Sequence, residues 1–148
     1  MLTFSRGLKP HSRPVSRVML HCSDSRPETT VEDIHRWHLG KGWSGIGYHW
    51  IVDAAGQVHE GRPEAVIGAG AMGHNDGVIH VCMIGMFDAR KPPEVQWQAT
   101  LQLLRERLAA HKLDHRAVLL HRDVDRQGKT CPGEAIDKAD VVAGVKAC

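Results

Sequence analysis

Short apolar runs, separated by polar or glycine-rich segments, dominate the sequence. Four of them have the length of buried strands. A fifth segment follows the tight turn 54–56 and has the pattern of the returning strand of a hairpin. We therefore expect strands at 17–23, 47–53, 57–61, 78–86 and 117–121.

A first helix is predicted after the loop that follows residue 23. Thr29 and Glu32 fit a capping box, in which each side chain bonds the backbone N–H of the other end of the motif. Gly40 and Gly42 are expected to end the helix. The residues that helical spacing places on one face are Val31, Ile34 and His38.

A second, longer helix is predicted after Pro92 and Pro93, and a short third helix at 137–147. The second has the clearest helical period in the chain, with apolar residues at i, i+4, i+7 and i+11. Those residues are Trp97, Leu101, Leu104 and Leu108.

The element order β-α-β-β-β-α-β-α predicts an α/β fold with a central mixed β-sheet flanked by helices. The 148 residues suit a single domain. Residues 1–16, which hold two prolines, a glycine and several basic residues, are interpreted as an irregular basic arm. The domain is expected to occupy residues 17–148.

Composition narrows the partners and the compartment. The net charge of +2 with neutral histidines is too small to indicate nucleic-acid binding. No apolar run approaches a membrane span, and the basic N-terminus lacks the apolar region of a signal peptide. We expect a cytoplasmic protein with reduced cysteines, in which Cys22 and Cys82 are small core residues.

Candidate chemistry appears where two predicted strands end alike, "VMLH" at 18–21 and "VLLH" at 118–121. If these strands are parallel neighbours, His21 and His121 emerge at the same carboxyl edge, where sites form in open α/β sheets. Cys131 follows in a loop that can fold back over this edge. Two imidazoles and a thiolate would leave a fourth zinc position for water, as in catalytic sites. The alternative is a satisfied polar group at a strand end and a small buried thiol.

Four stretches strengthen the first interpretation: "VMLHCSDSRP", "IHRWHLGKGWSGIGYHWIVDAAGQVHEGRP", "VCMIG" and "HRDVDRQGKTCPG". Together they resemble the type-2 zinc-dependent N-acetylmuramoyl-L-alanine amidases, the family of small phage lysozymes and peptidoglycan recognition proteins. The resemblance implies zinc ligands at His21, His121 and Cys131. It also implies a catalytic tyrosine at Tyr48 and a catalytic lysine at Lys129.

Two departures from the family pattern concern the substrate groove. Many relatives carry a histidine where this chain has Gly70, and a glycine where it has His80. The first change removes a potential substrate contact, and His74 and Asn75 remain candidates for contacts with the stem peptide or sugar. Asp123 and Asp125 are interpreted as loop-capping residues rather than metal ligands.

The remaining histidines are not assigned to the site. They are expected to be surface or half-buried residues, and they are His35, His38, His49, His59, His111 and His115. His49 follows Tyr48 in a predicted strand, so it is expected on the opposite side of the sheet, in the core.

The resemblance implies zinc-dependent hydrolysis of the amide between N-acetylmuramic acid and L-alanine in bacterial peptidoglycan. We expect a monomeric phage or prophage endolysin, held in the cytoplasm until it is released to the cell wall. Cys131 favours an enzyme, because family members that only bind peptidoglycan usually lack that ligand. The alternative is a peptidoglycan-binding or RNA-polymerase-regulating module with weak or no hydrolysis, with a protein partner at the N-terminal arm.

Overall fold

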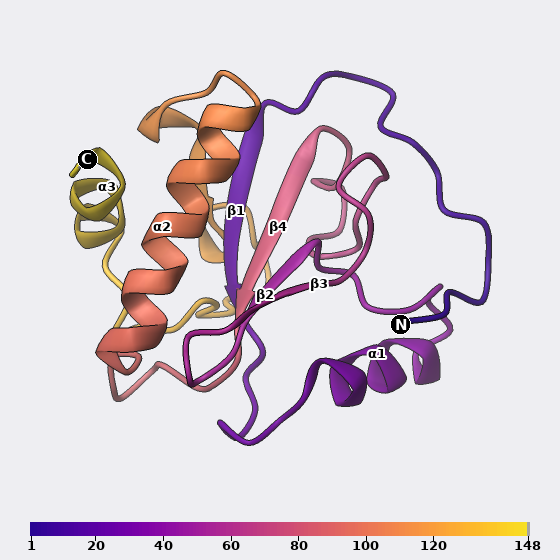
Figure 1. Cartoon of the computed structure of the whole chain (residues 1–148), viewed down its shortest axis with the longest axis horizontal. Helices are drawn as coiled ribbons and strands as arrows, with labels where there is room; N and C mark the ends of the chain where they lie inside the picture. Colours follow the sequence, from indigo (N-terminus) through magenta and orange to yellow (C-terminus); the bar gives the residue numbers. More distant parts are fainter. Residues whose placement is uncertain (148) are drawn as a thin grey trace.

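A five-stranded sheet forms the centre of the protein in the computed structural model, which describes residues 1–147 (Figure 1). Its spatial order is β3-β2-β4-β1-β5, in which only the β2–β3 pair is antiparallel. The predicted mixed sheet is thus confirmed. The strands are β1 (Arg17–Cys22), β2 (Trp50–Val52), β3 (Val58–Glu60), β4 (Val78–Met83) and β5 (Val118–Leu120).

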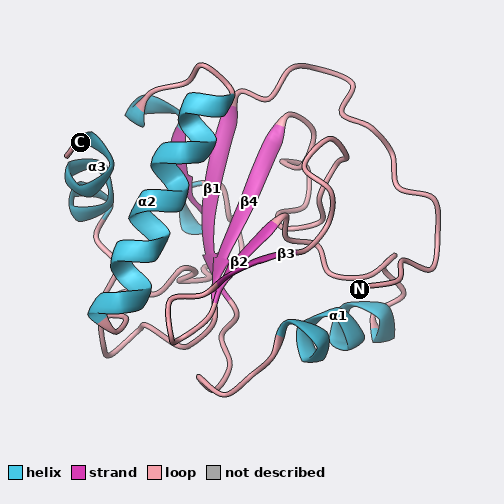
Figure 2. Cartoon of the chain, in the orientation of Figure 1, coloured by secondary structure: helices cyan, strands magenta, loops and turns pink. Residues whose placement is uncertain are grey.

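Three α-helices and two short 3₁₀ helices complete the fold (Figure 2). The strands and α-helices follow one another in the predicted order, whereas the two 3₁₀ helices were not predicted. The α-helices are α1 (Val31–Gly40), α2 (Glu94–Ala110) and α3 (Lys138–Lys146), and the 3₁₀ helices are η1 (His115–Ala117) and η2 (His121–Asp123). All five strands are shorter than expected, and the largest differences are at 47–49 and 84–86, which lie outside the ladders.

The two faces of the sheet have different partners. Alternate residues of β1 and β4, such as Val18, Leu20 and Val81, pack with α2 and α3 in the larger core. The residues between them, such as Met19 and His21, point to the other face. Figure 1 shows α2 and α3 together on one side, with α1 away from them near the N-terminus.

The start of α1 differs from the prediction by one residue. The N-cap is Thr30, whose Oγ1 accepts a hydrogen bond from Asp33 N–H while Asp33 Oδ2 accepts one from Thr30 N–H. Thr29 lies in the preceding turn, where its N–H donates to Arg26 O. Two capping-box motifs overlap in the sequence, Thr29 with Glu32 and Thr30 with Asp33. The second one forms, so the helix begins one residue later than expected. The predicted face is confirmed, since Val31, Ile34 and His38 are buried.

Residues 1–16 contain one isolated bridge, Pro10 to Val66, and otherwise no strand or helix. They nevertheless contact the domain closely. Leu2 and Phe4 pack against a second apolar cluster, and Thr3 O accepts a hydrogen bond from His35 Nε2. This cluster lies beside α1 and consists of Val31, Ile34, Ile46, Ile51 and Ile84. In Figure 1 the arm starts at the N-terminus near α1 and passes around the side of the sheet to β1.

The cysteine prediction is confirmed for two positions, because Cys22 and Cys82 are buried in the sheet. Cys148 lies outside the described residues. None of the helices within 1–147 is long and apolar enough to cross a membrane.

Candidate metal centre

Parallel pairing of β1 with β5 brings the two strand-end histidines together. Val18 pairs with Val118 and Leu20 with Leu120, so His21 and His121 follow at the same end of the sheet. Their ring centroids lie 4.7 Å apart. His21 is fully buried on β1, whereas His121 is half-buried at the first position of η2.

Cys131 reaches this edge on the loop between η2 and α3. The backbone N–H of Arg122 donates to Cys131 O at 2.8 Å, and Arg122 Nη1 donates to Gly133 O at 2.7 Å, which ties the loop to η2. The Cys22 N–H donates to Cys131 Sγ at 3.3 Å. Arg122 was not identified from the sequence, where only its place beside His121 could have indicated a role.

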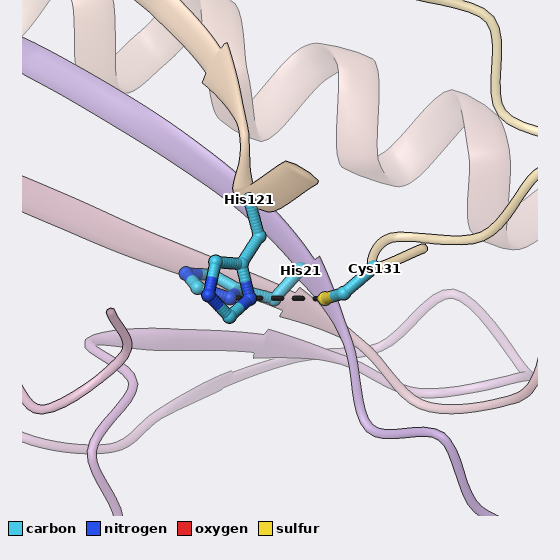
Figure 3. Close-up of side chains that lie close together, drawn as sticks. All are labelled: His21, His121 and Cys131. Carbon is cyan, nitrogen blue, oxygen red and sulfur yellow. Dashed lines mark hydrogen bonds between the residues drawn. The ribbon is translucent and has the colours of Figure 1, made fainter. Parts of the chain in front are cut away.

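One potential ligand atom from each of His21, His121 and Cys131 lies within 4.8 Å of the other two. The three side chains converge in Figure 3, where His21 Nδ1 is 3.9 Å from Cys131 Sγ. The structure thus brings together the residues that the sequence singled out as a possible ligand set.

Burial controls the ionisation of these groups. It lowers the pKa of His21 well below its ordinary value, and the neighbouring His80 and His121 lower it further. Burial also lowers the pKa of His121. Both imidazoles are therefore neutral near pH 7. The neighbouring Cys22 thiol, together with burial, raises the pKa of the Cys131 thiol.

Tyr48 packs on the same cluster from the segment before β2. Its ring centroid is 5.1 Å from that of His21 and 5.5 Å from that of His38. Burial and the nearby cysteine thiols raise the pKa of Tyr48 well above its ordinary value. Its hydroxyl therefore keeps its proton at neutral pH.

A groove of about 620 Å³ opens beside His121. Lys129 is exposed on its wall, and its backbone N–H donates to Asp125 Oδ2 at 2.8 Å. Asp123 Oδ2 accepts a hydrogen bond from Leu120 N–H at 2.9 Å, so both aspartates cap the loop as expected. The groove is lined by 69–75, 124–127, Trp43, His121 and Lys129.

Both candidate substrate-contact residues lie in this groove. His74 is exposed there. Asn75 Oδ1 accepts hydrogen bonds from Gly70 N–H at 3.0 Å and Ala71 N–H at 2.9 Å. Asn75 thus uses its side-chain oxygen to hold the glycine-rich wall in shape, and its side-chain NH₂ group takes no part in these two hydrogen bonds.

Gly70 and His80, the two departures from the family pattern, lie against each other in the structure. A Cβ added to Gly70 would lie 2.5 Å from Nδ1 of His80, so the ring of His80 fills the space beside Gly70. The sequence indicated each change separately. The physical link between them, with His80 buried next to His21, appears only in three dimensions.

The expectation for His49 was right about burial and wrong about the side of the sheet. His49 is buried, but its ring lies parallel to that of His80, with centroids 5.8 Å apart. Tyr48 contacts His21 on the same face. Strand alternation does not separate Tyr48 from His49, because β2 begins only at Trp50. His35 is also buried, although it was expected to be a surface or half-buried residue. The burial of His38 agrees with its place on the predicted face of the first helix.

Comparisons with known proteins agree with this fold. An endolysin of Klebsiella phage KP32 is 32% identical over 120 residues, covering 79% of this chain and 80% of the endolysin. Peptidoglycan-recognition protein SD of Drosophila melanogaster is 36% identical over 108 residues, covering 72% of this chain and 57% of that protein. The solved endolysin amidase LysCS from Clostridium intestinale URNW aligns with a TM-score of 0.89 and 25% identity, covering 97% of this chain and 90% of that chain.

The family itself matches residues 11–134, a range that holds His21, His121, Cys131, Tyr48 and Lys129. Most of the chain is therefore matched, and the fold neighbour covers nearly all of it. The chain belongs to the N-acetylmuramoyl-L-alanine amidase family.

Proposed function

We propose that this chain is a zinc-dependent endolysin that hydrolyses the amide between N-acetylmuramic acid and L-alanine in peptidoglycan. The observation that carries the proposal is the convergence of His21, His121 and Cys131, with His121 lining a groove of about 620 Å³. The family description, N-acetylmuramoyl-L-alanine amidase, supports the substrate class, and the similarity to phage endolysins supports the biological role.

The donor set suits zinc. Two neutral imidazoles and a thiol are borderline and soft ligands, which favour zinc over magnesium or calcium. A tetrahedral zinc site with usual bond lengths separates its ligand atoms by roughly 3.3–3.7 Å. The 3.9 Å between His21 Nδ1 and Cys131 Sγ is close to that range. Binding would displace the thiol proton, so it should release a proton and weaken in acid.

A bound zinc ion supplies a Lewis acid and a water molecule whose pKa is lowered toward roughly 7. The chain's own residues supply the rest. The groove binds and orients the muropeptide, and Lys129 on its wall offers a cation to the negative charge that develops on the carbonyl oxygen. Tyr48 keeps its phenolic proton and can hold a hydrogen bond at the reacting centre.

Digestion of defined muropeptides, followed by mass spectrometry, tests the proposal. Zinc-loaded protein should release free stem peptides with an N-terminal L-alanine, and a strong chelator should stop the reaction until zinc is restored. Cys131→Ser should lose bound zinc and almost all turnover. Lys129→Met should keep its zinc but lose about 10²–10³-fold in kcat, the range measured for oxyanion donors.

Lys146→Met serves as the matched control, because Lys146 lies on α3 outside the groove and should behave as wild type. Wild-type protein that carries zinc, stays folded and still releases no stem peptide would overturn the proposal. Retained binding to peptidoglycan in that experiment would instead favour a binding module.

A further inference from the structure

His80 contacts the ring nitrogen of His21 that does not face Cys131. His21 Nε2 lies 2.8 Å from His80 Nδ1, and the ring centroids are 4.9 Å apart. Both residues are fully buried. The other nitrogen of His21, Nδ1, is the one that faces Cys131 Sγ. The two nitrogens of His21 thus have separate partners.

This arrangement fixes where the protons must be if Nδ1 of His21 is to bind a metal. Nδ1 then needs a free lone pair, so the proton of the neutral ring sits on Nε2. Nε2–H must donate to Nδ1 of His80, which must itself be unprotonated. We propose that His80 is a positioning residue, which holds His21 in the ring orientation and tautomer required for zinc; this rests on the zinc site of the proposed function.

The surroundings of His80 hold its ring in one place. Its backbone N–H donates to His49 Nδ1 at 2.9 Å, and the two rings are parallel within 2°. A Cβ on Gly68 would lie 2.7 Å from His80 Cδ2, and a Cβ on Gly70 would lie 2.5 Å from His80 Nδ1. The absence of side chains at these two positions leaves the space that the ring occupies.

The far nitrogen of His80 argues against a purely structural role. Nε2 is buried and has no hydrogen-bond partner among residues 1–147. The tautomer that accepts from His21 places a proton on this nitrogen, and burying an unpaired donor opposes folding. A residue kept only for core packing would not need this nitrogen, whereas a residue that must present Nδ1 to His21 carries it unavoidably.

Two substitutions of similar size separate positioning from packing. Asn at position 80 can keep an acceptor oxygen near the place of Nδ1, whereas Leu fills similar space without one. Zinc affinity is measured by competition with a chromophoric chelator, and unfolding is measured in urea on the metal-free proteins. We expect His80→Leu to weaken zinc binding by about 10–100-fold, the range for lost outer partners of metal ligands. His80→Asn should recover most of that affinity.

The metal-free tautomer provides a second readout. Nitrogen-15 shifts of the His21 ring should show the Nε2-protonated form in wild type and His80→Asn, and a mixture in His80→Leu. Equal zinc affinity in wild type and His80→Leu would overturn the inference, as would equal losses of affinity and stability in both variants. Finding wild-type His80 protonated on Nδ1 would overturn it even if neither variant folds. Wild type that binds no zinc would instead refute the metal site of the proposed function.

Discussion

At the scale of single residues, the site depends on the free space around its candidate ligands as much as on the ligands themselves. His21 is buried among other imidazoles, and the strand that carries His80 is its direct neighbour in the sheet. The ring of His80 fits only because Gly70 has no side chain. A glycine in a loop thereby controls a buried contact of a candidate metal ligand, without contacting the metal centre itself.

Gly70→Ala should therefore weaken zinc binding. Gly70 does not have a positive φ, so alanine fits its backbone conformation, and the effect should come from the added methyl group displacing the His80 ring. We expect zinc affinity to fall by as much as in His80→Leu. The same chelator competition measures it. Gly7→Ala is the control, because a Cβ there has no neighbour within 4 Å. Equal affinity in Gly70→Ala and wild type would contradict the steric account.

At the scale of elements, local patterns were sufficient for most of the fold. Apolar runs and one strong helical period predicted the order of every strand and α-helix, because those signals come from residues close in sequence. Strand ends were less accurate, since a ladder stops where its partner stops. The β1–β5 pairing was predictable from two matching histidine endings, whereas the His80–Gly70 contact was not, because neither residue carries a local signal for the other.

The N-terminus of α1 gives an element-scale prediction that distinguishes two overlapping motifs. Thr30→Ala should lower the free energy of unfolding by about 1 kcal/mol, since it removes the side-chain acceptor for Asp33 N–H. Thr29→Ala should change it by less than about 0.5 kcal/mol, as expected for a surface substitution outside a cap. Urea unfolding of the two variants measures this difference. The reverse order of effects would move the cap to Thr29.

At the scale of the whole molecule, the unusual feature is the amount of buried imidazole. Five of the eleven histidines are buried, and all five lie in or beside the face of the sheet that carries the site. Several act as acceptors for backbone N–H groups, as His35 Nδ1 does for Ile46 and His38 Nδ1 does for Gly47. Burial lowers the pKa of four of them, His21, His38, His49 and His80, which links the stability of the fold to pH.

His38 allows this link to be measured away from the candidate ligands. Burial lowers its pKa to about 4, with the positive charges of Lys41 and Arg62 acting in the same direction. The unfolded chain has a histidine pKa of about 6.5, so below that pH the unfolded state binds the extra proton first. The stabilisation is thus fully present above about pH 6.5 and is lost as the pH falls toward 4. Its size is roughly 3 kcal/mol, at 1.36 kcal/mol for each pKa unit.

A variant that lacks the titrating imidazole of His38 should lose less stability as the pH falls. In His38→Asn the side-chain oxygen can still accept from Gly47 N–H, but it cannot titrate. Urea unfolding of metal-free protein at a series of pH values between 6.5 and 4 gives the slope of stability against pH. We expect the variant's slope to be smaller than that of wild type by up to about 1.4 kcal/mol per pH unit, which corresponds to one proton. Because the rest of the chain is the same in both proteins, its contribution largely cancels in the difference. Identical slopes would show that His38 does not couple folding to protonation.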